Sequence, residues 1–292
     1  MPQGIAGAHT PRGPAARRAP AMSFQPVLPL GGLAGWRFLQ RTMPAQQSAL
    51  NDSPPIARNA EHFRARIGEI ATPAELVEDR RLLTVALGAF GLQEDIDNRF
   101  FIRRILEEGT ARNDALANRL ADKRYAVFAR AFAFDAPQGP ATRAPGFADD
   151  IVARFERQSF EVAIGRRDED MRLALFADRE LRALARADST PRTKWFRVMG
   201  TPPLRAVVET ALGLPKSFGQ QDLDRQLETF RDRSARLFGS PDIAAFADPE
   251  VRERVIRQFL LQSEIGRVPA TTPGATALAL LESAASAGRS GV

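Results

Sequence analysis

The chain has 292 residues, of which 44% are hydrophobic, 26% charged and 8% aromatic, a balance typical of a folded globular protein. It contains no cysteine, which excludes disulfides, iron–sulfur clusters, thiolate zinc sites and thiol nucleophiles. Of its two histidines, His9 lies in a proline-rich segment that we expect to be disordered, which leaves only His62. A histidine triad or a two-histidine metal site is therefore not expected.

The net charge of +6 is unevenly distributed along the chain. Half of it comes from Arg12, Arg17 and Arg18, which lie in a stretch, 1–21, without any acidic residue. The remaining chain has the balance of an ordinary protein surface, whereas a phosphate-binding protein usually clusters its cations on one face. Nucleic-acid binding is therefore kept only as an alternative.

No stretch approaches the ~20 apolar residues that cross a bilayer. Pro2, Pro11, Pro14 and Pro20 interrupt the N-terminus where a signal peptide would need its apolar core. We expect a cytoplasmic protein whose residues 1–21 are a disordered extension from an early start codon.

We assign residues 22–71 to an N-terminal arm followed by helices. The prolines and glycines of 22–35 are typical of an extended arm, and apolar residues at helical spacing predict helices over 34–50 and 55–70. Because Trp36 and its apolar neighbours are too hydrophobic to remain exposed, we expect them to dock on the protein's own helical body. Docking on a second copy of the chain or on a partner protein is the alternative.

A first helical subdomain is predicted over 72–136. Thr72, Pro73 and Glu75 have the order of an N-cap, a first-turn proline and a capping-box acid, and the helix they begin is expected to end at Gly91 in a left-handed cap. Three shorter helices are expected to follow it, over 96–108 and from Asp114 and Asp122.

A linker rich in proline and glycine is predicted over 137–146, and a second helical subdomain over 147–270 follows it. Its helices are expected over 147–164, after Asp168, and over 191–199, 202–212, 221–238 and 249–265. A C-terminal helix over 274–286 and a tail complete residues 271–292. Since no run of alternating β-branched residues occurs, the predicted fold class is all-α and multihelical.

Short strings recur in the same order in both halves, as in an internal repeat. The pairs are 89–92 (AFGL) with 211–214 (ALGL), 95–97 (DID) with 222–224 (DLD), and 121–122 (AD) with 247–248 (AD). Such strings also match by chance in an alanine-rich helical protein, so duplication and coincidence both stay open. A true repeat predicts two related helical subdomains.

Two clusters of cations beside aromatic residues are candidate partner-binding sites. Lys123 and Arg124 precede the single tyrosine, and Lys194 and Arg197 flank a Trp-Phe pair. The preferred interpretation of both clusters is structural, with Asp122 capping a helix and the rings entering the core. With the arm included, the candidate partner-binding residues are Trp36, Lys123, Arg124, Lys194 and Arg197.

Asp95, Asp97 and Asn98 resemble the first ligands of a calcium loop. Arg99 and Phe100, however, stand where an EF-hand needs an oxygen ligand and a glycine, so we interpret these acids as helix caps. We expect no metal, no cofactor and no catalytic residue.

Several separated blocks resemble the bacterial DUF1217 family. In order they are LLTVALGAFGLQEDIDNRFFIRRILEEG, ALANRLADKRYAVFARAFAF, DMRLALFADREL, WFRVMGTPPLRAVVETALGLP and DLDRQLETF, together spanning roughly 75–270. The opening MSFQPVLPLGGLAGWRFLQRT is similar to that of alphaproteobacterial members. One departure is Ala133, which stands where the family has a polar residue.

The resemblance implies a helical protein with no assigned reaction, commonly encoded among flagellar genes of alphaproteobacteria. We therefore expect a non-enzymatic structural or interaction protein of flagellar assembly or motility, with flagellar or motility proteins as partners and a location at the flagellar base. The alternatives are a nucleic-acid-binding or regulatory helical protein, or an enzyme that uses only carboxylate and arginine chemistry.

Overall fold

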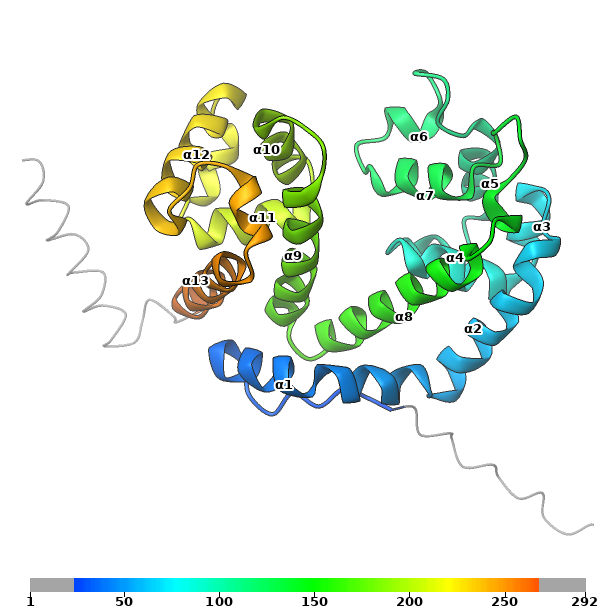
Figure 1. Cartoon of the computed structure of the whole chain (residues 1–292), viewed down its shortest axis with the longest axis horizontal. Coiled ribbons are helices and arrows are strands. Elements are labelled where there is room, and N and C mark those ends of the chain that lie inside the picture. Colours follow the sequence, from blue (N-terminus) through cyan, green and yellow to red (C-terminus); the bar gives the residue numbers. More distant parts are fainter. Residues whose placement is uncertain (1–23, 268–292) are drawn as a thin grey trace, which may run out of the picture.

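The computed structural model describes residues 24–267, which form two helical lobes side by side (Figure 1). This part of the chain contains 13 α-helices, five short 3-10 helices and no strand, which confirms the all-α prediction. The predicted extension 1–21 and the segment 271–292 lie outside the described residues.

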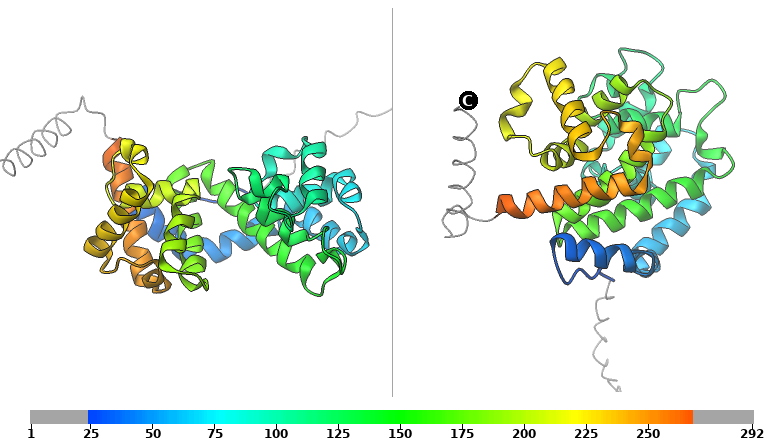
Figure 2. Two further views of the ribbon diagram at one scale, coloured as in Figure 1. Left: turned by 90° about the horizontal axis from the view of Figure 1, so that it is seen from above. Right: turned by 60° about the vertical axis from the view of Figure 1, so that its left-hand side comes forward.

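The first lobe is built from short helices, the second from longer ones, and one helix is shared. The first lobe contains α2 (Pro54–Arg66), α3 (Pro73–Glu78), α4 (Arg80–Ala89), α5 (Arg99–Glu108), α6 (Leu116–Arg119) and α7 (Arg124–Phe132). The second contains α1 (Gly32–Asn51), α9 (Glu169–Arg186), α10 (Pro191–Met199), α11 (Pro202–Ala211), α12 (Leu223–Phe238) and α13 (Pro249–Arg267). The shared helix is α8 (Phe147–Gly165). Seen from above, the lobes give the molecule an elongated outline (Figure 2). None of the helices within 24–267 is long and apolar enough to cross a membrane.

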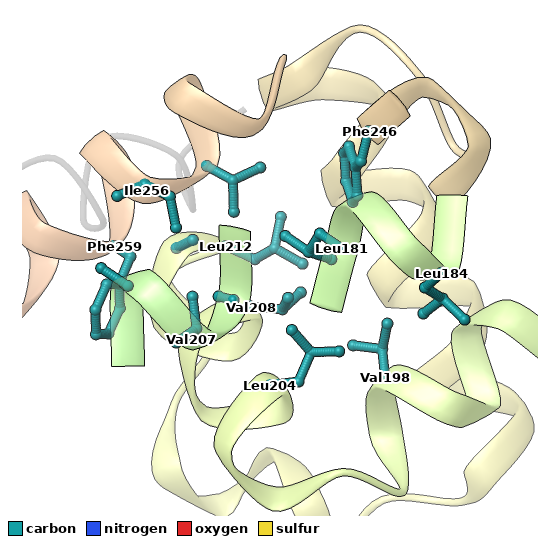
Figure 3. Close-up of a cluster of buried hydrophobic side chains, with 14 of the residues drawn as sticks. Leu181, Leu184, Val198, Leu204, Val207, Val208, Leu212, Phe246, Ile256 and Phe259 are labelled. Carbon is teal, nitrogen blue, oxygen red and sulfur yellow. The ribbon is translucent and has the colours of Figure 1, made fainter. Parts of the chain in front are cut away.

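Each lobe has its own hydrophobic core. In the first lobe, Phe128 and Phe132 of α7 are fully buried and their ring centroids lie 5.1 Å apart. In the second lobe, Leu181 of α9, Val207 of α11 and Ile256 of α13 meet in one buried cluster (Figure 3). These helices bury an apolar stripe, as their periodicity predicts, whereas α4 is buried around most of its circumference.

The two cores are divided inside α8, not at the predicted linker 137–146. Phe155 belongs to the core of the first lobe, while Phe160, one and a half turns later, belongs to that of the second. The predicted linker is itself anchored in the first lobe, where the buried Thr142 hydroxyl donates a hydrogen bond to the Ile70 carbonyl at 2.7 Å. Proline and glycine there mark an irregular connection, which the bond from Thr142 holds against the first lobe.

The helix predicted from Thr72 to Gly91 is two helices, α3 and α4. The backbone of Asp79 is extended, which ends α3. The Asp79 carboxylate accepts hydrogen bonds from the backbone amides of Arg81 and Leu82, and so caps the start of α4. An aspartate within an apolar helical pattern can therefore be a cap, because its short side chain satisfies first-turn amides.

Other predicted helix ends are confirmed. Thr72 and Glu75 form a complete capping box, and Gly91 has a positive φ of 71°. Asp114 does not cap α6, however. The Glu108 carboxylate accepts the hydrogen bond from the Leu116 amide at 2.7 Å instead.

The internal repeat stays a prediction, although its two AFGL-like strings form the same kind of turn. Gly91 and Gly213 both have positive φ, and the amide after each donates back across the helix end, from Leu92 to Leu87 and from Leu214 to Glu209, both at 2.9 Å. This Schellman closure is also common in unrelated helices.

Candidate functional site

Trp36 lies inside the fold and joins α1 to α13. Its side chain is only 4% exposed, and its indole Nε1 donates to Glu253 Oε2 at 3.0 Å. Gln40, one turn along α1, donates to the same oxygen at 2.9 Å. The helix after the arm therefore docks on the protein's own body, as expected, and partner binding by Trp36 stays a prediction that would require its release.

The arm preceding α1 folds back along that helix. The buried side chain of Gln46 accepts from the Val27 amide at 2.6 Å and donates to the Val27 carbonyl at 3.1 Å, so one carboxamide pairs with both groups of one peptide residue. Val27 and Leu30 are exposed on the outer side of the arm. Gln46 thus ties the arm to α1.

Lys123 and Arg124 are exposed, and their charged ends contact neighbouring segments. The Lys123 ammonium donates to the carbonyls of Asn118 and Leu120, at 2.8 and 2.9 Å, and so completes the C-terminal end of α6. The Arg124 guanidinium pairs with Asp122 and donates to the Gly91 carbonyl. These contacts connect α6, α7 and the turn after α4, which favours the structural interpretation.

The tyrosine beside this cluster has its ring in the first lobe and its hydroxyl at the rim. Tyr125 stacks edge-on against Phe101, with centroids 5.3 Å apart, and donates to Asp95 Oδ2 at 2.6 Å. Burial, then the hydrogen bond to the Asp95 carboxylate, raises the pKa of Tyr125 to about 12. The phenol is therefore a neutral donor at physiological pH.

The second cluster is divided between core and surface. Lys194 is only 8% exposed and its ammonium donates to the Ala185 carbonyl at 2.8 Å, at the C-terminal end of α9. Trp195 is fully buried and donates to the Pro241 carbonyl at 2.9 Å, while Arg197 is exposed. Lys194 is thus not an exposed cation, because its stem is packed and its charge satisfies a helix end.

The five candidate residues do not form one site. Lys123 and Arg124 belong to the first lobe, and the other three belong to the second. Among the five, Trp36 and Lys194 are buried. The exposed members available to a partner are Lys123, Arg124 and Arg197.

Glu161 is a buried carboxylate that the sequence analysis did not identify. It lies on α8 at 3% exposure, where Oε1 accepts from Arg179 of α9 at 2.5 Å and Oε2 has no hydrogen-bond partner among the described residues. Burial raises the pKa of Glu161 to about 7, against the opposing effect of Arg179. No local pattern marks it, since its burial results from the packing of α9 on α8.

Arg252 is a second buried charge without a sequence signal. Its guanidinium lies on α13, donating to Asp178 of α9 at 2.9 Å and to the carbonyls of Phe246 and Ala247 at 2.7 and 2.9 Å. These carbonyls belong to the 3-10 helix η5 (Ile243–Ala247). Arg252 thus fixes three segments of the second lobe to one another.

The acids that resemble a calcium loop are bound to neighbouring side chains. Asp97 pairs with Arg80 at 2.7 Å, and Asp95 accepts from Tyr125 and Asn98. His62 contacts the Asp79 carboxylate at 2.7 Å. Within residues 24–267, no three histidine or carboxylate side chains converge as a metal-binding group.

Ala133 has an unusual backbone. It ends α7 with φ 49° and ψ 42°, and it has the only positive φ of a non-glycine residue in the described chain. A Cβ makes this left-handed conformation costly, whereas asparagine and aspartate adopt it more readily. Alanine is therefore strained at this position.

Comparison with known proteins agrees with this architecture. Residues 89–251, more than half of the chain, match a family model described as "Protein of unknown function (DUF1217)". The crystal structure of protein AGR_C_984 from Agrobacterium tumefaciens is similar, with a TM-score of 0.65 and 24% identity over 83% of this chain and 99% of that one. At that identity the likeness shows the fold alone. Among curated proteins, none matches.

Proposed function

Because the chain belongs to the DUF1217 family, we propose that it is a non-enzymatic structural or interaction protein of flagellar assembly or motility. The family's description assigns no function, so the flagellar setting rests on the gene association implied by the resemblance. The proposed partners are flagellar or motility proteins, met at the cytoplasmic side of the flagellar base.

The observation that supports a structural role is the use of buried polar side chains to join segments. Lys194 binds the end of α9, Arg252 binds η5 and α9, and Gln46 binds the arm. Gln226 of α12 likewise donates to the carbonyls of Gly219 and Gln221. The bond from Arg252 to Asp178 joins two side chains, and each of the other bonds satisfies a main-chain group of another segment, as a scaffold that holds a fixed shape requires.

The surface charge pattern supports a protein partner over nucleic acid. Arginines of both lobes lie against carboxylates of their own chain, for example Arg64 on Asp149 at 2.8 Å and Arg192 on Asp224 at 2.7 Å. A phosphate-binding face presents its cations free of such acids. Mixed charges of this kind are typical of the polar rim of protein interfaces.

A deletion strain of a motile host tests the proposal. We expect fewer flagella or slower swimming, restored by the wild-type gene and equally by an Arg186→Ala control, which alters an exposed residue of α9. Normal swimming with normal flagellar number would contradict the proposal.

A further inference from the structure

The solvent face of α5 carries the most exposed large apolar side chain of the described chain. Phe100 is 79% exposed, although the adjacent Phe101 packs on Tyr125 and Ile102 is fully buried. At 100° per residue, Phe100 and Ile102 point to nearly opposite sides of the helix. The Phe100 ring is therefore directed away from the core of its own lobe.

Two ion pairs follow Phe100 on the same face. Arg103 pairs with Glu107 at 2.6 Å and Arg104 with Glu108 at 2.7 Å, each across one helical turn. We call Phe100, Arg103, Arg104, Glu107 and the partly exposed Glu108 the α5 face. Its two arginines are matched by the carboxylates of Glu107 and Glu108, so it offers no net attraction to a phosphate backbone or an anionic membrane.

The order of groups along the α5 face is self-complementary. If two α5 helices lie antiparallel about a two-fold axis between residues 105 and 106, Arg104 of each copy faces Glu107 of the other. The same axis places Phe100 of each copy just beyond the C-terminal end of the other copy's α5. A two-fold interface uses one patch twice, so each contact between opposite charges occurs in duplicate.

We propose that the α5 face binds a second copy of this chain in that antiparallel arrangement. Antiparallel helices also place opposite ends of their dipoles together, which favours this orientation. One face of a ten-residue helix is smaller than the roughly 1,200 Å² of a standard interface, so the dimer is weak and depends on concentration. This proposal does not rest on the flagellar assignment, because it concerns the isolated protein.

Sedimentation of the full chain, at up to about 1 mM protein, tests the proposal, since weak interfaces assemble in that range. We expect wild-type protein to dimerise and Phe100→Ser to weaken the dimer by at least about 10-fold, as loss of an aromatic interface anchor does. Val127→Ser, at another exposed apolar residue of the same lobe, is the matched control and should leave association unchanged.

A charge exchange tests the antiparallel register. Arg104→Glu and Glu107→Arg each place like charges opposite one another in a homodimer, so each variant alone should be monomeric. Mixing the two in equal amounts should restore a dimer, because every facing pair is then of opposite sign. Circular dichroism of each variant verifies folding. A monomeric wild-type chain, a dimer insensitive to Phe100→Ser, or no association on mixing would each overturn the proposal.

Discussion

Replacing Trp36 by alanine tests the packing of α1 on the second lobe. The side chain is 4% exposed, and a buried tryptophan removes about 150–250 Å² from water, worth about 4–6 kcal/mol at 25 cal/mol per Å². Large-to-small aromatic substitutions in cores cost about 3–5 kcal/mol, and we expect a loss of stability in that range. The Glu253 carboxylate keeps Gln40 as a donor, so the lost hydrogen bond adds little.

Urea unfolding, followed by circular dichroism, measures this change in the free energy of unfolding. Trp36→Phe keeps most of the apolar contact and should cost much less, while Arg37→Ala, at an exposed neighbour, should stay within about 0.5 kcal/mol. The reasoning is refuted if Trp36→Ala leaves stability unchanged but abolishes self-association or partner binding. The arm and α1 would then dock between molecules.

Three further predictions concern single residues. The pKa of Glu161 is about 7 in the folded state and 4.5 in the unfolded state, so the folded state keeps a proton that the unfolded state has already lost. The free energy of unfolding of the wild type should therefore fall as the pH rises from 4.5 to about 7. Between pH 5 and 8 the wild type should lose about 2–3 kcal/mol more than Glu161→Gln, measured by urea unfolding at each pH; equal losses would contradict the burial of this carboxylate. Ala133→Gly should raise the melting temperature, because glycine adopts the left-handed backbone without a Cβ penalty of about 1 kcal/mol; a lower melting temperature would argue against that conformation. Gly109→Ala should destabilise the protein by more than about 1 kcal/mol in thermal melts, because Gly109 has a positive φ and Asp135 occupies the place of an added Cβ. The control Gly68→Ala has open space around the added Cβ and should leave stability unchanged.

Helix ends were predictable where a local motif decides them. The capping box of Thr72 and Glu75 and the positive φ of Gly91 involve residues within a few positions of one another, so sequence spacing alone identifies them. The break at Asp79 was missed because its apolar neighbours continue the helical period across it. Periodicity reports which residues are buried, and it does not report whether the backbone stays helical between them.

The position of the division between the lobes could not be predicted, because it depends on long-range packing. The residues of α8 form one unbroken helical pattern, yet Phe155 and Phe160 enter different cores. Lys194 and Glu161 show the same limit, since a charged residue on a helix is usually exposed and only a facing helix can bury it. Of the five candidate residues, only Lys123, Arg124 and Arg197 are exposed, because no helix packs over them.

Co-purification of the tagged full chain from motile cells tests the proposed function most directly. The proposal predicts that basal-body or flagellar export components are enriched with the wild-type chain over an untagged control. Enrichment of nucleic acid, or recovery of the chain with no flagellar component, would contradict it.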